Sequence, residues 1–309
     1  MPPTIFVVAA TGTLGKAVAL ELLGAGWAVH ATTRDPTSAA ARELAAAGAR
    51  LFAGDWDDGA ALRAAARGCE GLFLNLAPSF ADAEADARQG EAIVAIAREA
   101  GVRHAVYAGG VPAMLEGIAE ADEGLVATFM RNKRRVEAAV RAAGFDAHTV
   151  LRPAGFMANW VAPKARGMFA GLAETGTLET ALRPDTVVVS VDERDVAAFA
   201  AAAFRDPARF RPAAATGVLV ASEAHTTEDI LAALSRASGK TLRAAYMDDR
   251  EAAARARVDP FVQGQLLSRG LARAFDMDAV RAWGIPLHSF REWLEREKDA
   301  VEMTYGHLE

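Results

Sequence analysis

The segment FMRNKRRVE (129–137) places one lysine among several arginines. An arginine stays protonated at neutral pH, whereas a lysine can lose its proton when its surroundings lower its pKa. Lys133 could therefore transfer a proton or hold a hydroxyl of a cofactor. The alternative is an ordinary solvated charge on a helix, because short runs of charge are commonly wet helix faces.

A second group of residues with chemical potential is the segment AATGTLG (9–15), which follows a β-branched run and opens a helical pattern. Small residues let backbone N–H groups approach a pyrophosphate, and the helix N-terminus adds a positive dipole. Ala9 stands where a first glycine is usual, and the alternative is a tight turn without a ligand. The residues predicted to bind a dinucleotide here are Thr11, Gly12, Thr13, Leu14 and Gly15.

Arg34 follows the second predicted strand, 19 positions beyond Gly15. An acidic residue in this neighbourhood would bind the adenosine ribose hydroxyls, whereas an arginine suits a 2′-phosphate. Asp35 is acidic, but its place before Pro36 predicts a helix N-cap. The sequence therefore favours NADP over NAD.

The elements that must position these residues alternate regularly over residues 1–153. Short apolar runs such as TIFVVAA and GLFLNLA are typical of buried parallel strands, and helical patterns with short joints separate them. Six such repeats predict an α/β fold, a Rossmann-type doubly wound parallel sheet with right-handed crossovers. We assign this region to a dinucleotide-binding domain.

After Pro153 the regular alternation ends, and residues 154–309 are predicted to form a smaller α/β lobe that covers the substrate. Two apolar runs, at about 186–191 and 217–221, are interpreted as strands, and one or both are expected to return to the main sheet. The segment TTEDILAALSRASGK predicts a helix that ends at Gly239, and Ser289 is expected to cap the terminal helix.

Composition excludes several classes of function. The net charge of −6 and the pI of about 5.6 argue against an electrostatic grip on nucleic acid. Cys69 is the single cysteine, which excludes an intrachain disulfide, and no histidine pair has metal-ligand spacing, so no metal site is expected. No apolar stretch approaches the roughly 20 residues that span a bilayer, and no signal peptide precedes the first strand. We expect a soluble, cytoplasmic protein.

The order of several motifs resembles that of NmrA-like proteins, a branch of the atypical short-chain dehydrogenases. These motifs are AATGTLG, TTRDP, AGDWDD, KRRVE, LRPAGFMANW, VDERDVAAF and SFREWL. The resemblance implies a Rossmann sheet with NAD(P) across the strand ends. It implies that Asp55 contacts the adenine and assigns Trp56 beside it to the cofactor. Leu76, Ala77 and Pro78 are implied to line the cofactor. The residues implied to border its nicotinamide end are Gly155, Phe156 and Asn159, and Asn159 is also a candidate to contact the substrate.

By the same resemblance, Lys133 matches the lysine that short-chain dehydrogenases hold near the nicotinamide ribose. Ordinary members carry a catalytic tyrosine four residues earlier and a serine or threonine after the fifth strand. This chain has Phe129 and the run Ala108, Gly109 and Gly110 at those places. Ordinary alcohol oxidation is therefore not expected. Phe129, Gly109 and Gly110 are candidates to line the substrate, whereas Phe156 and Trp160 could stack on substrate or belong to the core.

These observations predict an NADP(H)-dependent oxidoreductase that transfers hydride to a small conjugated acceptor such as a quinone, with Lys133 as the candidate catalytic residue. The alternative is a redox sensor that binds NAD(P) without turnover and acts through a protein partner. The expected ligands are small molecules, with neither nucleic acid nor membrane as partner, and the protein is expected to be a monomer or homodimer.

Overall fold

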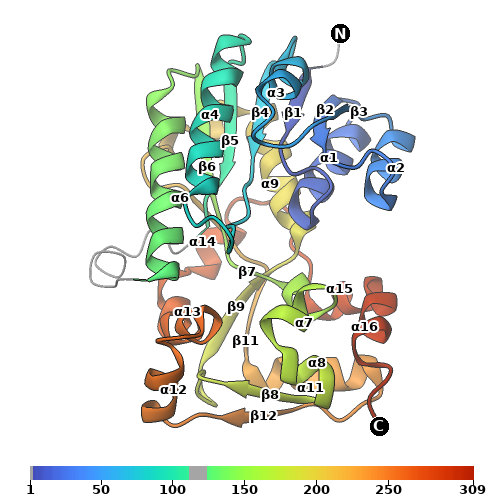
Figure 1. Ribbon diagram of the computed structural model, residues 1–309, viewed down its shortest axis with the longest axis vertical. Coiled ribbons are helices and arrows are strands. Elements are labelled where there is room, and N and C mark those ends of the chain that lie inside the picture. Colours follow the sequence, from blue (N-terminus) through green and yellow to red (C-terminus); the bar gives the residue numbers. More distant parts are fainter. Residues whose placement is uncertain (1–2, 111–123) are drawn as a thin grey trace. The chain divides into compact units, whose positions relative to one another are not determined.

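The computed structural model describes residues 3–110 and 124–309, and the chain divides into two compact units (Figure 1). The first unit comprises Met1–Pro153 and Val196–Val220. The second comprises Ala154–Asp195 and Ala221–Glu309. Residues 196–220 therefore belong with the large sheet, a range in which the sequence predicted a return to that sheet for the run at 217–221.

A parallel sheet of seven strands forms the centre of the first unit. Its strands are β1 (Thr4–Val7), β2 (Ala28–Thr33), β3 (Arg50–Ala53), β4 (Gly71–Leu74), β5 (His104–Ala108), β6 (Ala147–Pro153) and β10 (Val218–Val220). Their order is β10-β6-β5-β4-β1-β2-β3, and every neighbouring pair is parallel. This order is that of the Rossmann fold, so the predicted fold class is confirmed.

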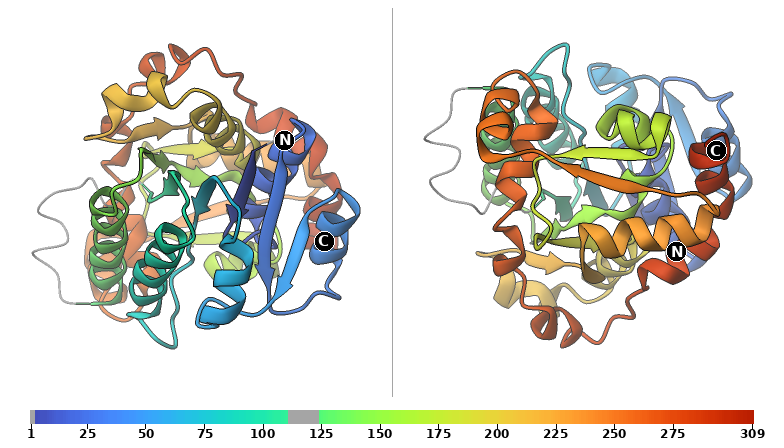
Figure 2. Two further views of the ribbon diagram at one scale, coloured as in Figure 1. Left: turned by 90° about the horizontal axis from the view of Figure 1, so that it is seen from above. Right: turned by 90° about the horizontal axis from the view of Figure 1, so that it is seen from below.

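Helices cover both faces of this sheet (Figure 2). They are α1 (Thr13–Gly24), α2 (Ala39–Ala46), α3 (Gly59–Ala66), α4 (Ala85–Glu99), α6 (Leu125–Ala142), the first-unit part of α9 (Glu193–Arg205), α10 (Pro207–Phe210) and the turn η3 (Arg211–Ala213). On one face, α3, α4 and α6 bury a core that includes Leu62, Ile93, Val136 and Val140 against Phe6. Because helices cover both faces, a central strand such as β4 is buried at all four positions.

Two expected helix starts can be compared with the structure. Helix α2 begins at Ala39, and Ser38 caps it by accepting a hydrogen bond from the N–H of Ala41. The prediction that Asp35 caps this helix is therefore wrong, because its carboxylate is bonded to the backbone and hydroxyl of Thr37 instead. Asp58 caps α3 by accepting hydrogen bonds from the N–H groups of Ala60 and Ala61.

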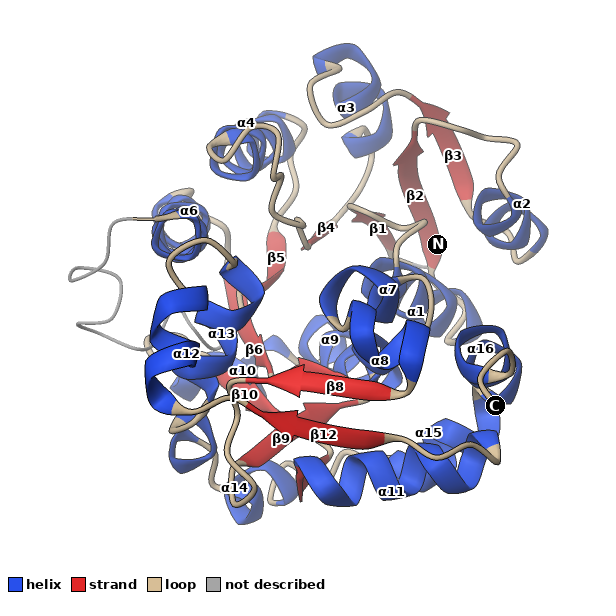
Figure 3. Ribbon diagram, turned by 60° about the horizontal axis from the view of Figure 1, so that its bottom comes forward, coloured by secondary structure: helices blue, strands red, loops and turns tan. Residues whose placement is uncertain are grey.

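The second unit contains two small sheets (Figure 3). One has the order β11-β9-β7, with β7 (Gly155–Phe156), β9 (Val187–Val191) and β11 (Glu223–Thr226); the other pairs β8 (Thr177–Thr180) with β12 (Arg243–Tyr246). Strand β9 thus lies outside the large sheet, so one of the two candidate runs returns to that sheet and the other does not. Strand β10 does join that sheet, beside β6.

Helices of the second unit supply most of its core. They are η2 (Met157–Trp160), α7 (Lys164–Met168), α8 (Ala170–Thr175), α11 (Thr227–Ser238), α12 (Asp249–Arg255), α13 (Pro260–Ser268), η4 (Leu271–Ala274), α14 (Met277–Arg281), α15 (Phe290–Arg296) and α16 (Lys298–Tyr305). Leu231, Leu234 and Trp293 are among the buried core residues. Gly239 ends α11 in the left-handed conformation and Ser289 caps α15, as predicted. Within the described ranges, no helix has the length and apolar character needed to cross a membrane.

Candidate functional site

The turn between β1 and α1 is closely packed around the carbonyl group of Ala9. The N–H of Gly12 donates a 2.9 Å hydrogen bond to that carbonyl oxygen. A Cβ atom on Gly15 would collide with the same oxygen, so only glycine fits there. Ala9 itself has a φ of +56°, in the left-handed region that L-residues rarely adopt. The turn therefore keeps its glycine-type conformation although its first residue is alanine.

The N-terminus of α1 is suited to an anion. Gly12 is the N-cap and offers no side chain, so no side-chain oxygen accepts hydrogen bonds from the first turn of the helix. Thr11 and Gly12 are exposed and Thr13 is half-buried, whereas Leu14 is buried beneath them. Backbone N–H groups and the helix dipole are thus available to a pyrophosphate, and these residues fit the cofactor that the sequence predicts.

Arg34 and Asp35, at the end of β2, differ in how they are engaged. The Arg34 side chain is exposed and makes no hydrogen bond or ion pair within the described part of the chain. Asp35 is held by Thr37, whose hydroxyl and N–H lower the pKa of this carboxyl. The arginine is therefore available for a phosphate, while the carboxylate already has local partners.

Asp55 and Trp56 lie just beyond β3. Oδ1 of Asp55 accepts hydrogen bonds of 2.9 Å from the N–H groups of Asp57 and Asp58, which fixes the turn before α3. Trp56 is half-buried and packs against the first-unit core. The Asp55 side chain is exposed, so contact with an adenine stays a prediction from the resemblance.

Lys133, on α6, contacts the loop that follows β4. Its Nζ donates a 2.6 Å hydrogen bond to the carbonyl oxygen of Leu76, one of the residues predicted to line the cofactor. Burial lowers the pKa of Lys133 to about 8, although the negative charge of Asp86 raises it. Lysine has three N–H donors, and the other two have no partner among the residues that the structure describes, so they can bind oxygen acceptors. Lys133 is therefore not an ordinary solvated charge.

The same loop is attached to α6 at other points. The Nδ2 atom of Asn132 donates to the carbonyl oxygen of Ala83 at 2.5 Å and to the buried carboxylate of Asp86 at 2.6 Å. About one helical turn after Asn132 along α6, Arg135 forms an ion pair of 2.7 Å with Glu84. These bonds fix the backbone of residues 76–86 against the helix that carries Lys133.

The positions of the missing hydroxyl groups can now be described. Phe129 lies one helical turn before Lys133 on α6 and is half-buried. Gly109 and Gly110 follow β5, and a Cβ on Gly109 would lie 2.8 Å from the ring of Tyr107. Tyr107 is buried, its hydroxyl donates to the backbone oxygen of Lys133, and burial raises its pKa. This tyrosine fastens α6 to the sheet and does not replace the missing proton donor.

The order of the sheet brings the loops after β1 and β4 next to each other. Strands β1 and β4 are neighbours, and between them the order of the strands reverses, which is where doubly wound sheets bind ligands. The glycine turn leaves one of these strands and the Leu76 loop leaves the other. The loops that carry Arg34 and Asp55 follow on the β1 side, and Gly109 follows on the β4 side.

Four predicted site residues lie in the second unit. Trp160 is buried, stacks on Phe169 with ring centroids 4.6 Å apart, and accepts a hydrogen bond on its carbonyl oxygen from Tyr305. Its ring belongs to the core, which is one of the two alternatives that the sequence left open for Trp160. Phe156 and Asn159 are half-buried and Gly155 is exposed. The Nζ atom of Lys164 lies 5.4 Å from the centre of the Phe156 ring.

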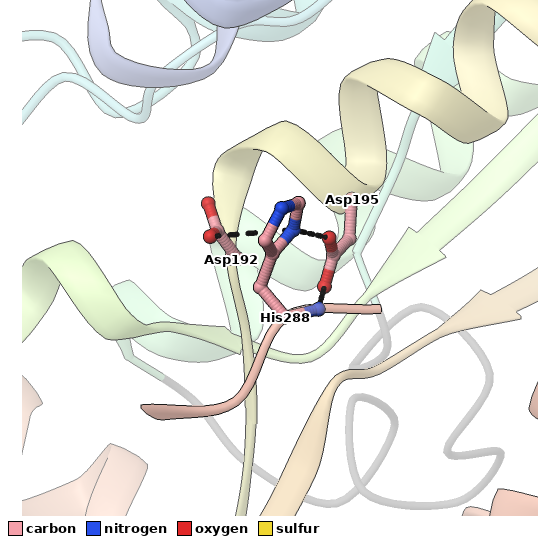
Figure 4. Close-up of side chains that lie close together, drawn as sticks. All are labelled: Asp192, Asp195 and His288. Carbon is pink, nitrogen blue, oxygen red and sulfur yellow. Dashed lines mark hydrogen bonds and ion pairs between the residues drawn. The ribbon is translucent and has the colours of Figure 1, made fainter. Parts of the chain in front are cut away.

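A buried polar cluster in the second unit was not anticipated from the sequence (Figure 4). Nδ1 of His288 lies 2.5 Å from Asp195 and 3.8 Å from Asp192, and both carboxylates are buried. Ser222 donates to Asp195 at 2.5 Å, and Arg296 pairs with Asp192 at 2.8 Å. Burial raises the pKa of the Asp195 carboxyl, although the hydrogen bonds from Ser222 and His288 oppose this shift.

The side chains of Asp192, Asp195 and His288 could offer ligand atoms to a metal ion, since these atoms lie within 4.8 Å of one another. Arg296 already supplies positive charge to Asp192, and Asp195 accepts bonds from the hydroxyl of Ser222 and the N–H of His288. The cluster therefore satisfies its charges internally and connects β9 and α9 with the C-terminal segment. Asp195 and His288 are 93 positions apart in sequence, so no local spacing indicates that they form a cluster.

Comparisons with known proteins agree with this arrangement. The NmrA-like family matches residues 1–266. A (4-alkanoyl-5-oxo-2,5-dihydrofuran-3-yl)methyl phosphate reductase of Streptomyces griseus is 32% identical over 305 residues, which cover 96% of this chain and 98% of that protein. An NAD(P)H azoreductase of Xenophilus azovorans is 31% identical over 241 residues, 77% of this chain and 75% of the relative.

Among solved structures, NmrA, a negative transcriptional regulator in complex with NADP, shares the fold with a TM-score of 0.69. The two proteins are 18% identical, and the match covers 97% of each chain. At this level of identity the likeness shows the fold alone.

Proposed function

The chain belongs to the NmrA-like family, and on that premise we propose that it is an NAD(P)H-dependent reductase of small conjugated acceptors such as quinones. The observation that carries this proposal is the contact between Lys133 and the carbonyl oxygen of Leu76. It joins two residues assigned to one cofactor, at the edge of a Rossmann sheet where its ligand is expected. Curated relatives of the family are reductases, which supports the same class of activity.

The residues of the first unit would hold the cofactor as follows. Backbone N–H groups of the first turn of α1, beyond Gly12, bind the pyrophosphate, and Arg34 binds the 2′-phosphate, which favours NADPH over NADH. Asp55 and Trp56 border the adenine, and the loop Leu76, Ala77 and Pro78 lines the middle. Lys133 donates to the ribose hydroxyls next to the nicotinamide, because the carbonyl of Leu76 takes up one of its three donors.

Bound NADPH would supply two electrons and a proton as hydride, and the acceptor must then gain a second proton from elsewhere. A quinone reduced in this way becomes a hydroquinone anion, which water can protonate without a special donor. An alcohol substrate would instead need a base to remove its proton, and the positions of Phe129 and Gly109 offer none. The proposed reaction is therefore the reduction of acceptors whose product is a stabilised anion.

The named substrates of relatives support this class of acceptor. The name of the Streptomyces griseus reductase describes a 5-oxo-2,5-dihydrofuran ring, in which a C=C bond is conjugated to carbonyl groups, and the Xenophilus azovorans enzyme is named for azo compounds. Both are conjugated systems that accept hydride. In this chain, Phe129, Gly109 and Gly110, all in the first unit, are proposed to line the acceptor. The assignment of Gly155, Phe156 and Asn159 to the nicotinamide end stays a prediction from the resemblance.

A second function is favoured by one observation, the loss of both catalytic hydroxyl groups. A protein with this site could bind NAD(P) and report its presence to a protein partner without turnover. The fold-level likeness to NmrA, which is named as a transcriptional regulator, is consistent with that alternative but does not favour it, since fold does not imply function.

The two functions are separated by following NADPH oxidation at 340 nm against a panel of quinones and enals. Turnover of any acceptor supports the reductase, whereas cofactor binding without turnover of the panel supports the sensor. A protein that binds neither NADPH nor NADH would contradict both. The cytoplasmic location and the monomeric or homodimeric state stay predictions from the sequence.

A further inference from the structure

The loop between β4 and α4 carries an exposed aromatic side chain, Phe80, that the cofactor assignment does not use. Phe80 is 59% exposed, which is unusual for a phenylalanine, and it lies between two stretches of loop that are fixed to α6. Lys133 bonds to Leu76 on one side of it, and Asn132 bonds to Ala83 on the other. The backbone that presents Phe80 is therefore held in place from both ends.

Phe80 is paired with Phe129. Their ring centroids are 5.5 Å apart and the ring planes meet at 86°, an edge-to-face arrangement typical of aromatic pairs. Phe129 and Lys133 are four residues apart on α6, so their side chains are neighbours on one face of the helix. The aromatic pair consequently lies beside the lysine that would hold the nicotinamide ribose.

The chemistry of the pair indicates what it would bind. The face of a phenylalanine ring carries partial negative charge, and it attracts the positive edges or the electron-poor faces of other flat rings in offset-stacked or edge-to-face contact. Quinone rings are flat and electron-poor, whereas an open-chain enal offers little area for such contact.

We propose that Phe80 and Phe129 form an aromatic wall that binds the planar ring of the acceptor, so that Phe80 is a specificity-determining residue for fused-ring quinones over open-chain conjugated carbonyls. This inference rests on the proposed function in one respect, that Lys133 marks the nicotinamide end of the cofactor.

The test compares 1,4-naphthoquinone with trans-2-hexenal in wild type and in Phe80→Ala, Phe80→Leu and Phe80→Tyr. We expect kcat/KM for the quinone to fall roughly 2- to 10-fold in the alanine and leucine variants and to be retained in the tyrosine variant, as for loss of one aromatic pair. The value for the enal and the KM for NADPH should stay within about twofold. Met303→Ala, which removes another exposed apolar side chain on α16, is the matched control and should change neither.

Two results would overturn the inference while leaving the reductase intact. One is a Phe80→Leu variant that reduces naphthoquinone as well as wild type does. The other is an equal loss for quinone and enal, which would make Phe80 a structural residue of the loop.

A binding measurement distinguishes failure of the inference from failure of the proposed function. 2-Naphthol is a flat ring that accepts no hydride, and calorimetry can follow its binding to protein saturated with NADP⁺. If wild type reduces no acceptor, the proposed function fails, and naphthol alone decides the inference. Weaker binding to Phe80→Ala than to wild type supports the aromatic wall, and equal binding or none overturns it.

Discussion

Nζ of Lys133 lies 2.6 Å from the carbonyl oxygen of Leu76, so a helix residue and a loop residue that are 57 positions apart in sequence are in direct contact. This bond accounts for the placement of the lysine in a site and not in solvent. It also fixes the direction of the ammonium group, because a short hydrogen bond to a carbonyl restricts the end of a flexible side chain. The loop and the helix can therefore present their groups to one cofactor.

The first prediction concerns the role of Lys133 in binding and in chemistry. Lys133→Met should weaken NADPH binding by about 10- to 150-fold, the equivalent of about 1.5–3 kcal/mol for hydrogen bonds from a charged group. Turnover of a quinone at saturating NADPH should fall by less than about tenfold, because water can protonate the product. Stopped-flow and steady-state assays measure the two quantities separately. A fall of about 10²–10⁴-fold in turnover would instead make Lys133 the proton donor.

The pH dependence of NADPH use is the second prediction. The pKa of Lys133 is lowered to about 8 by burial, so its positive charge is lost above that pH, and kcat/KM for NADPH should decline there. Asp86→Asn removes the negative charge that raises this pKa, and the decline should move to lower pH. Lys133→Arg keeps its charge at all these pH values and should show no such decline. A profile that is identical in all three proteins would contradict the assignment.

The same pKa has a consequence for stability, which is the third prediction. Below about pH 8 the lysine is protonated in both states, and the folded protein bears the cost of burying an ammonium group. Between about 8 and the ordinary value of 10.5 the unfolded chain binds more protons than the folded one, so this contribution to the free energy of unfolding rises with pH. Urea unfolding of wild type and Lys133→Met from pH 7 to 10 should show that rise only in wild type. Parallel curves would contradict it.

Much of the first unit could be predicted because its signals are local. A β-branched run, a glycine turn and a helical pattern lie within some 20 residues of one another, and each repeat is short enough to be recognised by itself. The strands with which a given strand pairs in a sheet are not indicated by such local signals. The run that forms β9 has the composition of a buried strand in any sheet, so its pairing with β11 and β7 could not be read from it.

The errors and open alternatives in the candidate site have a similar cause. Asp35 and Ser38 are both good helix caps, and only the backbone bonds to Thr37 show that Asp35 is used elsewhere. Whether Trp160 faced a ligand or Phe169 depended on a side chain nine positions away in a region without regular periodicity. The contact of His288 with Asp195 joins residues 93 positions apart, which no spacing rule covers.

The fourth prediction tests the preference for NADPH. Arg34 has no partner within the described residues, so its removal should leave the fold intact. Arg34→Ala should lower NADPH affinity by about 10- to 150-fold, or about 1.5–3 kcal/mol, with NADH affinity unchanged. Arg34→Lys keeps the charge but lacks the planar guanidinium group, so its NADPH affinity should lie between those of wild type and Arg34→Ala. Thermal melts in each cofactor give the comparison, and NADPH should raise the melting temperature of wild type more than NADH does. Equal loss of both cofactors would mean that the arginine is structural.

The last prediction uses the backbone of the glycine turn. Ala9 has a φ of +56°, and a left-handed conformation costs an L-residue about 1–2 kcal/mol. Ala9→Gly removes that cost and adds about 0.4–1 kcal/mol of freedom to the unfolded chain, so the net effect should be a stabilisation of up to about 1.5 kcal/mol. NADPH affinity should be retained, because the turn already has the conformation that glycine prefers.

Its neighbour provides the matched control. Ala10 is fully buried and does not have a positive φ, so Ala10→Gly loses packing and gains unfolded-state freedom, and it should destabilise the protein by about 1 kcal/mol or more. Gly15→Ala should abolish NADPH binding, because its Cβ would collide with the carbonyl oxygen of Ala9. Urea unfolding of the three variants measures their free energies of unfolding, and titration with NADPH measures their cofactor affinities. If Ala9→Gly and Ala10→Gly destabilise the protein equally, residue 9 is under no strain, and the alanine in this turn has the same conformational cost as any other.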